Sequence, residues 1–112
     1  MKYKNIYGTI NIDVFDTKIK WFIGDFNDFV KKYKLEDQEL EDSIGLTMTV
    51  DDYILIYSDC TEYLNTIPHE AVHAVSRISD HRNLLFNTDN SEMLAYLVGY
   101  ISGKILGSKL LK

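Results

Sequence analysis

The pattern of apolar residues changes halfway along the chain, and this change constrains the fold more than any other feature. In the first half, apolar residues partly alternate with polar ones, as in residues 3–15. In the second half they recur every three or four residues, as in residues 64–78. Alternation is typical of β-strands and the longer spacing of α-helices. Strands followed by helices predict an α+β domain in which a sheet packs on helices.

The first half predicts a sheet, antiparallel or mixed, with one short helix inserted. Gly8 is expected at a β-bulge. Asp25 can cap the short helix, which would end near Tyr33. A two-residue acidic turn, Asp51-Asp52, joins two apolar runs and predicts a β-hairpin. The expected strands cover residues 3–15, 18–23, 46–50 and 53–57.

The second half predicts two helices joined by a polar loop over residues 79–90. The first helix is expected over residues 64–78, with Asn65 or Thr66 as its cap and Pro68 in its first turn. The second is expected from Ser91 to about Leu106. Small residues recur every fourth position along it and form a ridge that would let the first helix approach closely. The ridge consists of Ala95, Gly99 and Gly103.

Length, charge and cysteine count narrow the classes of protein. The 112 residues suit one domain, residues 1–112. A formal charge of −5 argues against a nucleic-acid partner, which needs clustered cations. A single cysteine, Cys60, excludes a disulfide within the chain and suits a reducing cytoplasm. The most apolar run, 93–103, is too short to span a membrane. No oligomeric state is predicted.

The residues that carry chemistry are His69, Glu70 and His73, arranged as HExxH. On a helix, positions i and i+4 lie on one face, so both imidazoles can reach one zinc ion. Glu70, beside the first ligand, can take a proton from a water molecule that the metal activates. Two partly exposed helix histidines beside a solvated glutamate are the non-functional alternative.

A catalytic zinc ion needs a third protein ligand and one open position. Glu92 follows His73 after eighteen intervening residues, positions 74 to 91, which is enough for a turn and a returning helix. Asp80 and His81 are alternatives if a turn follows the first helix directly. Glu92 also fits a capping box that begins at Asp89.

The motif, the spacing and the glutamate on a following helix resemble the gluzincin metallopeptidases. The resemblance covers about residues 64–103. It implies a small zincin-like domain in which His69, His73 and Glu92 hold one Zn²⁺ and Glu70 is the catalytic base. The residues from Glu92 to Tyr96 are also similar to the third-ligand helix of small stand-alone peptidases. Many of those are encoded by phages, which would place this chain in the host cytoplasm.

The resemblance therefore implies zinc-dependent hydrolysis of a peptide or protein substrate. Gluzincins take their transition-state donor from a second domain, and 112 residues leave no room for one. His81 or Tyr96 could serve instead. The strand expected over residues 53–57 could pair with an extended substrate. The alternatives are a non-catalytic interaction module, metal-stabilised or virion-associated, and a regulator that cleaves one specific partner.

Overall fold

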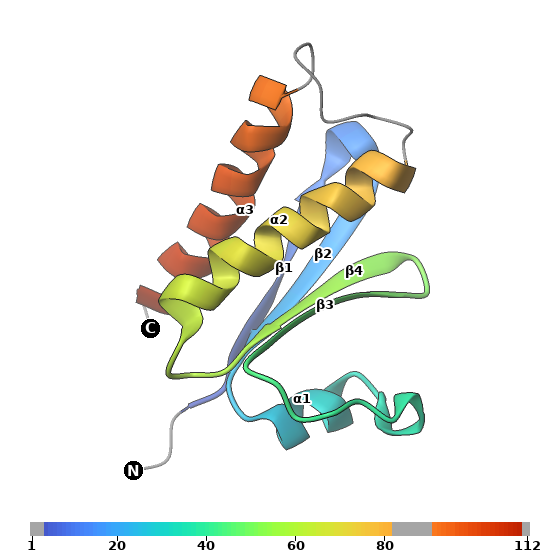
Figure 1. Cartoon of the computed structure of the whole chain (residues 1–112), viewed down its shortest axis with the longest axis vertical. Coiled ribbons are helices and arrows are strands. Elements are labelled where there is room, and N and C mark those ends of the chain that lie inside the picture. The colour runs from blue at the N-terminus through green and yellow to red at the C-terminus, as the bar shows by residue number, and fades with distance from the viewer. Residues whose placement is uncertain (1–3, 82–90, 111–112) are drawn as a thin grey trace.

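A four-stranded mixed sheet forms the centre of the protein, in the order β1-β2-β4-β3 (Figure 1). The computed structural model describes residues 4–81 and 91–110, apart from the side chains of residues 81, 109 and 110. β1 and β2 are antiparallel, as are β3 and β4, while β2 and β4 run parallel. The strands are β1 (Ile6–Ile12), β2 (Thr17–Ile23), β3 (Gly45–Val50) and β4 (Tyr53–Ser58).

Helices cover both faces of the sheet. α2 (Tyr63–His81) and α3 (Ser91–Leu110) lie on one face, and α1 (Phe26–Lys32) lies on the other (Figure 1). Alternation along β2 produces the two cores. Trp21 packs in the core under α2 and α3, whereas Phe22 packs with Phe29 of α1. The α+β class and the hairpin with its Asp51-Asp52 turn are thus confirmed.

Two expectations for the strands are wrong. Gly8 does not form a bulge but pairs with Trp21 in an unbroken register. A Cβ at Gly8 would lie 2.8 Å from the Trp21 ring, so the glycine makes room for the indole. β4, expected to offer a free edge, lies between β2 and β3. The free edge beside the HExxH helix belongs to β3.

α2 begins earlier and ends later than its sequence pattern predicts. It starts at Tyr63, and the caps expected at Asn65 or Thr66 lie inside it. Just before its start, the carboxylate of Asp59 accepts hydrogen bonds from the N–H groups of Thr61 and Glu62. Residues 79–81 continue the helix instead of opening the loop, so Asp80 is helical.

α3 packs through a different face from the one expected. Its buried residues line the core with α2 and β1, whereas Ala95, Gly99 and Gly103 are exposed. A Cβ at Gly99 or Gly103 would meet nothing within 4 Å. The small ridge therefore does not contact α2. Within residues 4–81 and 91–110, no helix is long and apolar enough to cross a membrane. The buried residues of α3 are Leu94, Leu97, Ile101 and Ile105.

Candidate metal site on helix α2

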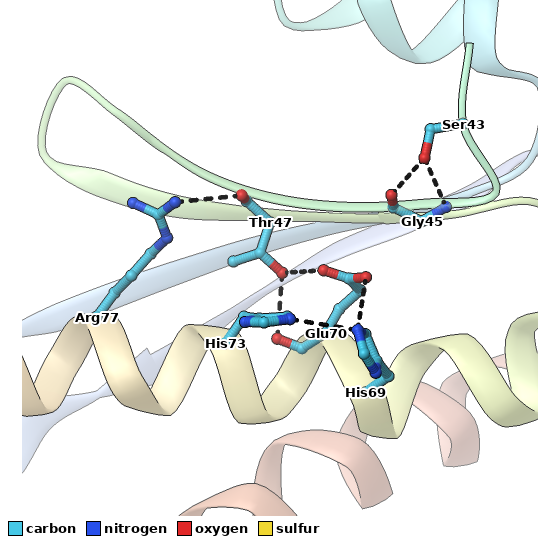
Figure 2. A network of polar contacts seen from close by, with 7 residues as sticks. All are labelled: Ser43, Gly45, Thr47, His69, Glu70, His73 and Arg77. Carbon is cyan, nitrogen blue, oxygen red and sulfur yellow. Dashed lines mark hydrogen bonds and ion pairs between the residues drawn. The ribbon is translucent and has the colours of Figure 1, made fainter. Parts of the chain in front are cut away.

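The two histidines of HExxH point toward one another from successive turns of α2 (Figure 2). Their Nε2 atoms are 3.2 Å apart, and their ring planes are inclined by 72°. If an ion were bonded to both nitrogens at about 2.05 Å, the usual zinc–imidazole length, the nitrogen–ion–nitrogen angle would be about 100°. That angle is close to tetrahedral. The same distance also suits a hydrogen bond between two neutral imidazoles, so the pair fits a metal without requiring one.

The histidines and Glu70 differ sharply in exposure because β3 covers Glu70 and leaves the histidines open to solvent. The His69 side chain is 68% exposed, so an ion and a substrate can reach it. Glu70 is only 7% exposed and lies between α2 and β3. Its Oε2 is 4.0 Å from Nε2 of His69. A carboxylate oxygen at this distance from the His69 nitrogen is near enough to accept a proton from a water molecule held between the two.

The edge strand β3 fixes the position of Glu70. The Thr47 hydroxyl donates to Oε1 of Glu70 at 2.6 Å and lies 3.1 Å from its carbonyl oxygen (Figure 2). Gly45 allows this close approach, because a Cβ there would lie 3.0 Å from Oε2 of Glu70 and would collide with Thr66. β3 thus holds both carboxylate oxygens, with Thr47 at Oε1 and Gly45 beside Oε2.

An open cleft of about 560 Å³ runs between α2 and β3. Gly45 and Thr47 line it from the strand, and Glu70, His73 and Arg77 line it from the helix. Because residues of β3 alternate in direction, the side chains of Leu46, Met48 and Val50 pack in the core with α1, while those of Thr47 and Thr49 face α2.

The residues proposed to complete the metal shell are placed less favourably. Among the side chains that the structure describes, which do not include that of His81, no three of His, Cys, Asp or Glu are close enough together to hold an ion. Glu92 lies in the first turn of α3 and is exposed. The structure brings His69 and His73 together and leaves Glu92 apart, so its role as a ligand stays a prediction.

Asp80 and His81 do not lie in a turn after the helix. Asp80 is seven residues beyond His73 on the same helix, a rise of about 10 Å, which is too far for direct ligation beside the histidines. His81 is the last residue of α2, and its side chain lies outside the described part of the chain, as do Asp89 and the start of the proposed capping box.

Tyr96, the other proposed donor to the transition state, is 72% exposed on α3. Its ring stacks on Tyr100 at 6.4 Å between centroids. This contact explains its position without reference to the histidines.

Sequence reasoning overlooked three residues of the cleft, namely Gly45, Thr47 and Arg77. A signal was present, because Thr47 and Thr49 alternate with Leu46, Met48 and Val50 in a predicted strand. A polar face of this kind usually indicates exposure to water. Here it faces the helix that carries the histidines.

Comparisons with protein-family models, curated proteins and solved structures each find no match to this chain.

Proposed function

We propose that this protein is a minimal metallopeptidase of gluzincin-like, zincin-type design that hydrolyses peptide bonds with one zinc ion bound at His69 and His73. The observation that supports this best is the 3.2 Å separation of the two Nε2 atoms beside the buried Glu70 carboxylate. Imidazole is a preferred zinc ligand, and a carboxylate beside such a pair is the base that hydrolysis requires. Glu92 remains the proposed third ligand, with His81 as its alternative.

The bound ion would supply Lewis-acid chemistry to the scissile carbonyl and to water. Glu70 takes the proton from the attacking water and passes it to the leaving amine. The hydroxyl of Thr47, 2.6 Å from Oε1, keeps the carboxylate turned toward the histidines. Oε2, on the side nearer His69, is the oxygen free to receive the proton.

β3 is the proposed binding edge for an extended peptide, in place of β4. It is an edge strand, and its polar face lines the cleft that holds Glu70 and His73. A peptide added beside β3 would hydrogen-bond to its main chain and lie along α2. The main chain of the substrate would then pass the histidines in a fixed register.

The Glu70→Gln variant tests the function directly. It removes the base and keeps the shape and burial of the side chain, so we expect zinc to bind and peptide hydrolysis to fall by about 10²–10⁴-fold. Zinc content by mass spectrometry under native conditions and initial rates on a quenched peptide library measure the two effects. Glu62→Gln, an exposed glutamate before α2, is the matched control. Equal turnover by Glu70→Gln and wild type would contradict the assignment.

A further inference from the structure

Arg77 crosses the cleft from α2 to the edge strand. It lies one turn beyond His73, so His69, His73 and Arg77 follow one another at intervals of four residues along one face. Its Nη1 donates to the hydroxyl of Thr49 at 3.1 Å. Its Nη2 donates to the carbonyl of Thr47 at 3.4 Å (Figure 2).

The Thr47 carbonyl belongs to the free edge of β3. The N–H of Asp59 donates to the carbonyl of Ile44, and this pair continues the register of the ladder by one step beyond Gly45 and Ser58. In an antiparallel pair every second residue bonds to the partner strand, so Gly45, Thr47 and Thr49 direct their main-chain groups outward. The hydroxyl of Ser43 already contacts both such groups of Gly45, at 3.2 and 2.6 Å. Arg77 contacts the carbonyl of the next outward-directed residue, Thr47, with which the main chain of a substrate would pair.

The hydrogen bonds of Arg77 are weaker than those its guanidinium can form. Both acceptors are uncharged oxygens, and the 3.4 Å bond is long. A carboxylate would accept two parallel, charge-assisted bonds from the same fork, which are shorter and stronger. A substrate that brings a carboxylate into the cleft can therefore draw Arg77 away from Thr47 and free the carbonyl for the substrate's own N–H.

We propose that Arg77 selects peptides that carry a carboxylate near the scissile bond, either an acidic side chain or a free C-terminus. This inference rests on the proposed peptidase function. The helix rises about 9 Å from the midpoint of the two histidines to Arg77, which equals between two and three residues of an extended chain. The carboxylate is therefore expected two or three residues from the scissile carbonyl.

Acidic side chains near Arg77 would repel a substrate carboxylate, so the opposite selectivity is a distinct outcome that an experiment can detect. Asp80 lines the same cleft, and Asp51 and Asp52 line a neighbouring cavity of about 480 Å³ that Arg77 also borders. If these carboxylates governed recognition, the cleft would select lysine instead of glutamate.

The test is a panel of quenched peptides, amidated at the C-terminus, that place Glu, Gln or Lys at each position near the scissile bond. A second set carries a free C-terminus at the same positions and distinguishes the two sources of carboxylate. We expect kcat/KM of the zinc-loaded protein to favour Glu over Gln by about tenfold at one position, the effect of one charge-assisted hydrogen bond. In Arg77→Met this ratio should fall toward one, while Lys31→Met, an exposed cation on α1, should retain it.

The same panel, titrated against Glu70→Gln protein by fluorescence anisotropy, measures selectivity without turnover. Tighter binding of the carboxylate peptides, lost with Arg77→Met, supports the inference even if no peptide is cleaved, in which case only the peptidase function fails. Equal affinity for Glu and Gln peptides, binding of neither, a preference for Lys, or a ratio that Arg77→Met leaves unchanged would each overturn it.

Discussion

At the scale of single residues, the hydrogen bond from Thr47 to Glu70 positions the carboxylate on which the proposed hydrolysis depends. Thr47→Val keeps the size and β-branching of the side chain and removes the hydroxyl. Because the carboxylate of Glu70 is buried, loss of its donor should destabilise the fold by about 1–3 kcal/mol. It should also lower kcat more than it changes KM, since the base is left less well oriented.

Urea denaturation and steady-state kinetics measure both effects of Thr47→Val. Thr9→Val, at an exposed position of β1 away from the cleft, is the matched control and should change neither by more than about 0.5 kcal/mol. A Thr47→Val protein with the stability and kcat of wild type would show that β3 does not position Glu70.

The sequence contains the spacing of His69, Glu70 and His73, and the structure confirms that the two imidazoles converge. A spacing of four on a helix is a local property, so it can be predicted without the fold. Thr47 and Glu70 are 23 positions apart, and their contact depends on how β3 packs on α2. No local pattern contains that information.

At the scale of elements, the approach of β3 to α2 depends on Gly45. In Gly45→Ala the new methyl group would lie 3.0 Å from Oε2 of Glu70 and collide with Thr66, so strand and helix must separate. We expect a loss of about 1–3 kcal/mol in the free energy of unfolding, as in other overpacked sites, together with reduced hydrolysis. Chemical denaturation and peptide turnover measure the two effects.

Gly99→Ala on α3 is the matched control for Gly45→Ala, and its effect should have the opposite sign. A Cβ at Gly99 meets nothing within 4 Å, and alanine favours a helix over glycine by about 1 kcal/mol. Replacement of glycine by alanine should therefore stabilise the protein at position 99 in α3 and destabilise it at position 45, where β3 contacts α2. If Gly99→Ala destabilised the protein, the ridge would have a packing role that this arrangement does not give it.

The elements differ in how far their sequences determine them. The hairpin of β3 and β4 is predicted well because its turn and both strands are adjacent in the chain. The face through which α3 packs is not predicted well, because α3 is apolar around most of its circumference. Its ridge of small residues is also compatible with either a helix contact or an exposed surface. Glu92 is exposed because it lies outside the face through which α3 packs on the core.

At the scale of the whole molecule, the cores and the candidate metal site are separate. The two apolar clusters contain neither His69 nor His73, and both histidines are exposed. Metal is therefore expected to add stability to a fold that already exists, unlike the metal of a zinc finger. Removal of zinc with a chelator should leave the circular dichroism spectrum unchanged.

The size of that added stability tests the metal site and identifies its third ligand. Free zinc at one hundred times its dissociation constant should raise the free energy of unfolding by about 2.7 kcal/mol, because it binds the folded chain alone. His73→Ala should abolish the increase, since a single remaining imidazole binds the ion weakly. Comparison of Glu92→Ala with His81→Ala then identifies the third ligand. The variant that has lost the ligand should show a smaller zinc-dependent increase, and the other variant should retain it. Denaturation curves with zinc and with chelator measure each difference, and a wild-type protein that zinc does not stabilise would contradict the site itself.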